Sequence, residues 1–170
     1  VIKEAIMTPE KKYAHHYREM AKICAEQGWG DPFSYARSKE ILAANRLGHT
    51  IADTFSGADA FNKSGAPVEY KSTTSKKVKG SYTGISVFDT WEKQVEYLRN
   101  KKIAKYPEHY YNRFENGQLV ESWVMSGAKV FEILVPKMKK KFPTVLKKKD
   151  PRLSATVSNG EIKKYGKRVI

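Results

Sequence analysis

The chain has 170 residues, which suits one folded domain spanning residues 1–170, and it carries a net charge of +14. Hydrophobic residues make up 40% of it, a share typical of a globular protein. No apolar run approaches the ~20 residues that a transmembrane helix needs, and the first residues lack the layout of a signal peptide. Its single cysteine, Cys24, excludes an internal disulfide and a zinc ribbon. We therefore expect an intracellular protein of the cytoplasm or nucleoid, with no membrane partner.

The positive charge is concentrated in two blocks. Residues 1–70 hold nine Lys or Arg against nine Asp or Glu, whereas residues 71–105 hold nine against three and residues 137–170 hold twelve against two. Clustered lysines attract polyphosphate backbones and release their counterions, so this pattern predicts binding to nucleic acid. On charge alone, an anionic membrane or a partner protein remains the alternative.

The N-terminal part of the sequence predicts two helices. The first begins after an N-cap at Thr8 and ends near Gly28. The second is expected within residues 31–49, starting at an Asp-Pro pair and ending at Gly48. Apolar residues recur along the first helix at three- and four-residue steps: Tyr13, Tyr17, Met20, Ala21 and Cys24.

Two short strands are expected next, at residues 50–55 and 66–74. The sequence NKSG between them has the residues of a turn. A basic loop rich in Ser, Thr and Gly follows over residues 74–84. A third helix is predicted within residues 89–106, capped by Asp or Thr at its start.

The C-terminal part predicts one hairpin, one helix and a further turn. Asn116-Gly117 lies between two strand-like runs and is the strongest short hairpin signal. A helix within residues 126–142 is expected to break near Pro136, and Asn159-Gly160 predicts a second turn. The whole pattern favours a mixed α/β (α+β) fold in which helices flank a small mixed central sheet. We interpret the histidines as surface or capping residues: His15, His16, His49 and His109.

Three ionisable residues on and beside the second strand could carry chemistry. Residues two apart in a strand share a face, so Glu69 and Lys71 project together. Asp59 precedes the turn, and it lies beside Glu69 if the chain turns back there. Neighbouring carboxylates repel each other unless a cation lies between them, and Mg²⁺ prefers such oxygens, to which the backbone carbonyl of Tyr70 could add another. This arrangement suits phosphodiester hydrolysis, with Lys71 beside the attacking water.

Asp59 followed by the Glu-Tyr-Lys run at 69–71 resembles the signature of the PD-(D/E)XK nuclease superfamily, to which many type II restriction endonucleases belong. Ala58 stands where the namesake proline would be. Members often carry a glutamate on a helix before the aspartate, and Glu40 has that place here. The resemblance covers residues 36–74. It implies a restriction-endonuclease-like core, one or two Mg²⁺ ions held by the two carboxylates with Glu40 as a further ligand, and a DNA substrate.

The combined prediction is a Mg²⁺-dependent endonuclease that cuts double-stranded DNA, sequence-specifically, with Asp59, Glu69 and Lys71 as catalytic residues. Because one chain holds one such site, cutting both strands of a palindrome calls for a homodimer. A junction-resolving or repair nuclease on the same fold is one alternative. A non-catalytic nucleic-acid-binding protein is another, in which the charged hairpin would be only a solvated turn.

Candidate DNA contacts lie in both basic blocks. Lysines are expected at backbone phosphates, while Ser81 and Tyr82, in the loop after the catalytic strand, are expected near bases. Arg113 with Asn112, and Arg152 with Asn159, near the two predicted turns, are the candidate base readers. The candidate lysines are Lys76, Lys77, Lys79, Lys139, Lys140, Lys141, Lys147, Lys148 and Lys149.

Overall fold

The computed structural model describes residues 7–53 and 57–170, and its fold is mixed α+β, as predicted. Its helices are α1 (Pro9–Gln27), α2 (Arg37–Leu47), α3 (Trp91–Tyr97), α4 (Gly127–Val145) and α5 (Asn159–Tyr165), and a π-helical turn, Leu98–Lys102, continues α3. Its strands are β1 (Thr50–Ile51), β2 (Ala60–Phe61), β3 (Pro67–Thr73), β4 (Gly80–Ser86), β5 (Glu108–Glu115), β6 (Gln118–Ser126), β7 (Arg152–Val157) and β8 (Lys167–Arg168). Within these two ranges, no helix combines the length and the apolar character needed to cross a bilayer.

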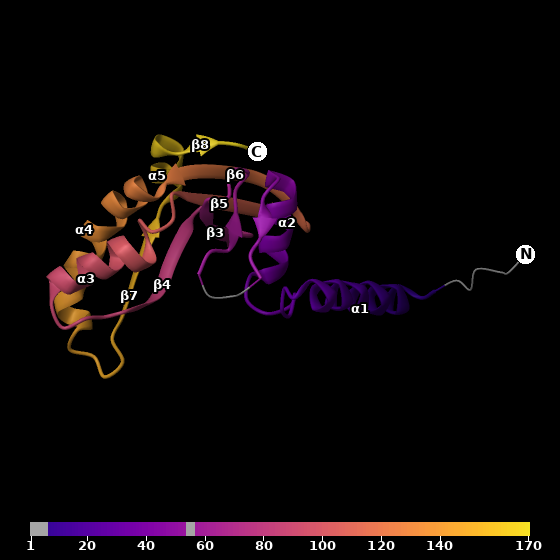
Figure 1. Ribbon diagram of the computed structural model, residues 1–170, viewed down its shortest axis with the longest axis horizontal. Helices are drawn as coiled ribbons and strands as arrows, with labels where there is room; N and C mark the ends of the chain where they lie inside the picture. Colours follow the sequence, from indigo (N-terminus) through magenta and orange to yellow (C-terminus); the bar gives the residue numbers. More distant parts are fainter. Residues whose placement is uncertain (1–6, 54–56) are drawn as a thin grey trace, which may run out of the picture.

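Six strands form one sheet in the order β1-β2-β3-β5-β6-β8. Neighbouring strands run antiparallel except β3 and β5, which run parallel. The connection between β3 and β5 contains β4 and α3, and β4 pairs with β7 in a separate two-stranded ribbon (Figure 1). The predicted class, a small mixed sheet flanked by helices, is therefore confirmed.

Side chains on the two faces of the sheet belong to two apolar clusters. On one face, Tyr70 and Tyr110 pack with residues of α2. On the other face, Tyr111 packs with residues of α4 and of the β4–β7 ribbon. Since consecutive residues of a strand point to opposite faces, Glu69 and Lys71 project to the side of the second cluster. The candidate catalytic residues therefore lie at the edge of the larger core.

Several predicted ends of elements are confirmed. The Thr8 side chain caps α1, and Gly28 ends α1 in the left-handed conformation, with φ of 69°. Gly48 ends α2 in the same way. The hairpin between β5 and β6 turns at Asn116 and Gly117, whose φ values of 48° and 75° are those that such a turn requires. Local capping and turn chemistry is thus sufficient to place these boundaries.

The start of the second helix differs from the prediction, because α2 begins at Arg37 and not at Asp31. The carboxylate of Asp31 accepts hydrogen bonds from the backbone N–H of Phe33 at 2.9 Å and from the hydroxyl of Ser34 at 2.7 Å. These bonds stabilise a turn in place of a first helical turn.

Two further predictions for the C-terminal part are wrong. α4 runs on through Pro136, because an apolar stripe on both sides of the proline is buried against the core. Asn159-Gly160 starts α5 instead of forming a hairpin turn, because Ser158 and Glu161 form a capping box. The stripe on α4 consists of Val130, Leu134, Met138, Phe142 and Val145.

Three predicted elements are shorter than expected. The strand at 50–55 is seen as β1, and residues 54–55 lie outside the described residues. The basic loop ends at residue 79, because Gly80 starts β4. The third helix is regular only over α3, and it ends in the π-helical turn. Of these differences, the early start of β4 matters most for the candidate site.

Candidate active site

The segment from Asp59 to Lys71 turns back on itself, as the sequence predicts. β2 and β3 are antiparallel neighbours. Directly before β2, the backbone N–H of Asp59 donates to the Val68 carbonyl at 3.0 Å, and its Oδ2 accepts from the N–H of Tyr70 at 2.6 Å. Because Glu69 lies between these two partners, the carboxylate of Asp59 is held next to it.

Glu69 and Lys71 form an ion pair on one face of β3. Nζ of Lys71 lies 2.5 Å from Oε1 of Glu69, and the two side chains are 23% and 17% exposed. The same ammonium group lies 4.8 Å from the centroid of the Tyr82 ring. Both contacts favour one position of the lysine side chain. The ammonium group is therefore held at the carboxylates instead of extending into solvent.

Glu40 and a buried arginine connect α2 to this hairpin. Oε2 of Glu40 lies 3.2 Å from Nη1 of Arg37, which is only 1% exposed. The guanidinium also donates to the Trp29 carbonyl at 2.7 Å and to the Ala52 carbonyl. The N–H of Ala52 in turn donates to the carbonyl of Asp59 at 3.0 Å. Arg37 thus links the helix that carries Glu40 to the segment that carries the aspartate.

The carboxyl group of Asp59 is strongly perturbed. Burial raises its pKa, and the neighbouring charges of Glu69 and Glu40 raise it further, to about 7, although the hydrogen bond from Tyr70 and the charge of Lys71 oppose this. Ionising Asp59 therefore costs free energy in this environment, because its charge is poorly hydrated and faces two like charges. A cation placed at these oxygens would remove that cost.

A chain of buried hydrogen bonds adjoins Lys71. His109 is fully buried, and burial lowers its pKa to about 4, so its ring is neutral. Nε2 donates to the Ile103 carbonyl at 2.9 Å, and Nδ1 therefore accepts from the Tyr82 hydroxyl at 2.8 Å. The Tyr82 oxygen lies 3.0 Å from the hydroxyl of Tyr111 and accepts from it. The prediction that His109 is a surface or capping residue is wrong, because β4 covers it.

The donor set at the hairpin suits Mg²⁺. In the part of the chain that the structure describes, no three His, Cys, Asp or Glu side chains form a ready-made metal-binding group. Mg²⁺ does not need one, since it keeps several waters and binds proteins through one or two carboxylates. Asp59 and Glu69 supply two such groups, and burial together with the charges of Glu69 and Glu40 raises the pKa of Asp59, which a bound cation would oppose. Tyr70, whose carbonyl is the expected third ligand, lies opposite Tyr110 in the sheet.

The loop between β3 and β4 presents the lysines that were expected at phosphates. They are exposed around a hollow of about 480 Å³ that the loop shares with the residues joining β7 to α5. Ser81 is also exposed, whereas Tyr82 is buried in β4 with its hydroxyl bonded internally. The prediction that Tyr82 approaches a base is therefore wrong. The exposed lysines of this loop are Lys76, Lys77 and Lys79.

The C-terminal lysines are exposed, but one of them has a structural contact. Nζ of Lys141 donates to the carbonyl of Ser154 at 2.8 Å and so ties α4 to β7. The others lie on the solvent side of α4 and in the turn that follows it. These are Lys139, Lys140, Lys147, Lys148 and Lys149.

Both predicted base-reading arginines are paired with carboxylates. Arg113 lies 2.9 Å from Glu121 and 3.2 Å from Glu115, and its side chain is 20% exposed. Arg152 lies 3.3 Å from Asp150 and is more exposed. Reading a base with Arg113 would require two ion pairs to break, so the structure contradicts a free guanidinium at this position.

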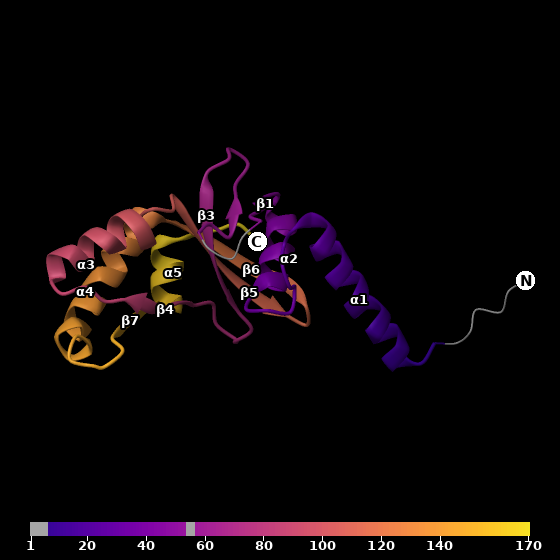
Figure 2. The same cartoon turned by 60° about the horizontal axis from the view of Figure 1, so that its bottom comes forward.

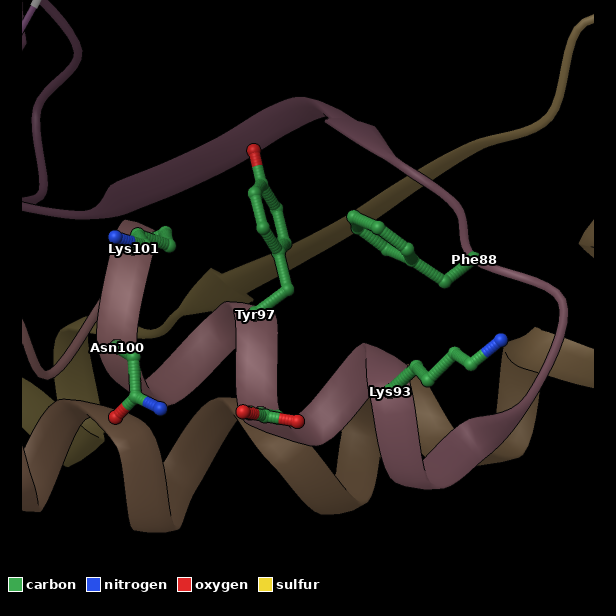
Figure 3. A pocket seen from close by; sticks show the side chains of 6 residues that line it. Phe88, Lys93, Tyr97, Asn100 and Lys101 are labelled. Carbon is green, nitrogen blue, oxygen red and sulfur yellow. The ribbon is translucent and has the colours of Figure 1, made fainter.

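A separate hollow of about 280 Å³ lies along α3. Figure 3 shows the rings of Phe88 and Tyr97 side by side, with Lys93 and Lys101 among the side chains that line it. The two ring centroids are 4.9 Å apart. Its lining includes a single carboxylate, Glu96. This hollow therefore lacks the paired carboxylates that define the site at β2 and β3.

Sequence reasoning missed the groups that support the candidate site. Arg37 stands three residues before Glu40, a helical spacing that brings side chains together and could have indicated the pair. The position of His109, opposite Glu69 in the parallel β3–β5 pair, depends on the strand order and has no local signal. No model of a known protein family matches this chain, and no curated protein matches it either. The resemblance to PD-(D/E)XK nucleases therefore rests on these residues and their geometry.

Proposed function

We propose that this chain is a Mg²⁺-dependent endonuclease that hydrolyses phosphodiester bonds in double-stranded DNA. The proposal includes site-specific, type II restriction-like cutting within the cell, by a homodimer in which each copy supplies one site. The observation that carries it is the convergence of Asp59, Glu69 and Lys71 at one hairpin. There, the Asp59 carboxylate accepts a 2.6 Å hydrogen bond from the backbone N–H of Tyr70, and Nζ of Lys71 lies 2.5 Å from Oε1 of Glu69.

Each residue has a role that its surroundings support. Asp59 and Glu69 would hold Mg²⁺, with Glu40 as a further ligand or as an orienting charge beside them. When bound, Mg²⁺ polarises the phosphate and lowers the pKa of a water molecule. Lys71 orients the attacking water and stabilises the negative charge that develops on the phosphate.

The position of Lys71 suits this role better than a structural one. An ammonium group that is held by Glu69 and by the Tyr82 ring keeps one geometry without being fully buried. Such preorganisation lowers the entropic cost of reaching the transition state. The exposed lysines at residues 76–79 lie in the loop that joins β3 to β4, where they can bind the DNA backbone.

Cleavage of a long natural duplex DNA, with and without Mg²⁺, tests the proposal. Wild-type protein is compared with Glu69→Gln and with Lys71→Met. Glu132→Gln is the matched control, since Glu132 also pairs with a lysine, Lys129, but on the surface of α4. We expect discrete Mg²⁺-dependent fragments, a loss of at least about a hundredfold in rate for both site variants, and DNA binding that all the variants retain.

Each other outcome has a distinct meaning. Cutting at the wild-type rate by Glu69→Gln or Lys71→Met contradicts the assignment of the site. A smear of products indicates a nonspecific nuclease, and cutting of branched DNA alone indicates a junction-resolving enzyme. DNA that is shifted on a gel but never cut, whatever its structure, indicates a non-catalytic binding protein.

A further inference from the structure

The exposed large apolar side chains are concentrated near the N-terminus. Of the thirteen in the described residues, eight lie within residues 7–42, which make up about a fifth of the chain. Scattered apolar residues are ordinary on a protein surface, whereas a concentrated group marks an interaction site. The eight are Met7, Tyr13, Tyr17, Met20, Ile23, Phe33, Tyr35 and Leu42.

Four of these side chains lie along one side of α1, which extends away from the rest of the molecule in both views (Figures 1 and 2). Tyr13 is 72% exposed, and Met20 and Ile23 are 44% and 49% exposed. The helix has 19 residues and is therefore about 28 Å long. In the described part of the chain, the helix is covered near its middle, where the Tyr17 ring stacks on Phe33 with centroids 3.7 Å apart, and near its C-terminal end, where Cys24 is buried.

An apolar groove continues this stripe at the base of α1. It has a volume of about 190 Å³ and lies between α1 and α2. Met20 and Ile23 line it from α1, and Ile41 and Leu42 line it from α2. Trp29, in the connection between the helices, is also part of its lining. The stripe and the groove together form one continuous apolar surface, which we call the α1 surface.

The charge of α1 favours a second copy of the chain as the partner of this surface. The helix carries four Lys or Arg against three Glu, so it is almost neutral within a chain of net charge +14. Residues 9–18 hold three cations against one carboxylate, and residues 19–27 hold one against two. The helix dipole adds positive charge at the first half and negative charge at the second. Two such helices attract each other when they lie antiparallel, whereas DNA finds little net positive charge here.

We propose that the α1 surface is the interface of a two-fold symmetric homodimer, in which the α1 helices of the two copies pack antiparallel. The apolar stripes meet at the centre, and the N-terminal end of each α1 helix lies toward the groove between α1 and α2 of the other copy. A two-fold axis uses the same surface on both copies, which agrees with a helix that is self-complementary in charge. This inference goes beyond the proposed reaction and does not depend on it.

Sedimentation velocity of the full chain, without DNA or Mg²⁺, tests the interface. We expect the wild-type protein to dimerise reversibly as its concentration is raised from about 1 to about 100 µM. Tyr13→Lys and, separately, Met20→Lys place a charge in the apolar seam, and each is expected to weaken dimerisation at least about tenfold. His15→Lys adds the same side chain on the opposite side of α1, and it should leave the dimer intact.

Circular dichroism verifies that each variant keeps its fold, which the exposure of Tyr13 in the single copy leads us to expect. A wild-type protein that stays monomeric over the whole concentration range overturns the proposal. A dimer that Tyr13→Lys and Met20→Lys leave as tight as the wild type shows that another surface is used, and overturns it too. If the variants dissociate but the protein cuts no DNA, the interface stands and the proposed reaction falls.

Discussion

Replacing Asp59 by asparagine is expected to stabilise the metal-free protein above neutral pH. Burial and the charges of Glu69 and Glu40 raise the pKa of Asp59 from 3.8 to about 7. A carboxyl group whose pKa is higher in the folded state contributes stability that is fully present below pH 3.8 and is lost as the pH rises through about 7. Asparagine keeps an acceptor for the N–H of Tyr70 but carries no charge, so it removes this loss.

The size of the effect follows from the shift in pKa. A difference of about three pKa units corresponds to roughly 4 kcal/mol of folding free energy once the carboxyl group is ionised. Relaxation and water around the half-buried site reduce this value, so we expect a gain of about 2–4 kcal/mol for Asp59→Asn near pH 8. For a chain of this size, that gain raises the melting temperature by roughly 5–10 °C.

Urea unfolding of both proteins in EDTA, from about pH 4 to about pH 8, measures this effect. The difference in free energy of unfolding should be smallest at the acid end and grow as the pH rises. Asp53→Asn makes the same chemical change at an exposed position and is the control. Adding Mg²⁺ should stabilise the wild type more than Asp59→Asn. A difference that is constant with pH, or one that grows toward acid, would refute the reasoning.

Two further substitutions test the structure around the site. His109→Leu removes a buried acceptor and the donor to the Ile103 carbonyl, and should lower the free energy of unfolding by about 1–3 kcal/mol at neutral pH. Burial lowers the pKa of His109 from 6.5 to about 4, so the wild type should lose this advantage as the pH falls from 6.5 toward 4. Urea unfolding of both proteins at neutral pH and at about pH 4 measures the loss. Gly80→Ala places a Cβ 2.1 Å from the Tyr111 ring and should cost about 1–3 kcal/mol in thermal unfolding, whereas Gly160→Ala, which has open space, should not. Equal melting of the two glycine variants would show that the ring can move aside.

The short-range part of the candidate site could be predicted from the sequence. Strand alternation places Glu69 and Lys71 on one face, and a turn of a few residues brings Asp59 back beside them. These relations span about a dozen residues, so local geometry is enough to establish them. The partners of the site, Arg37 and His109, come from segments whose position depends on the strand order and on the packing of α2, for which no local pattern exists.

The sequence alone determined the mixed class of the fold, the capped first helix, the end of the second helix at Gly48 and the turns before β3 and between β5 and β6, because caps, turns and alternation act between neighbours in the chain. Only the tertiary structure decided that α4 continues through Pro136 and that Tyr82 lies inside, beneath Lys71. In both cases, contacts with distant segments outweigh a local preference. In α4, burial of the apolar stripe compensates for the backbone hydrogen bond that Pro136 cannot donate. In the predicted basic loop, pairing with β7 makes residues 80–86 the strand β4. Packing free energy is the sum of many small contacts between residues that are distant in the chain, so it cannot be inferred from any one short segment.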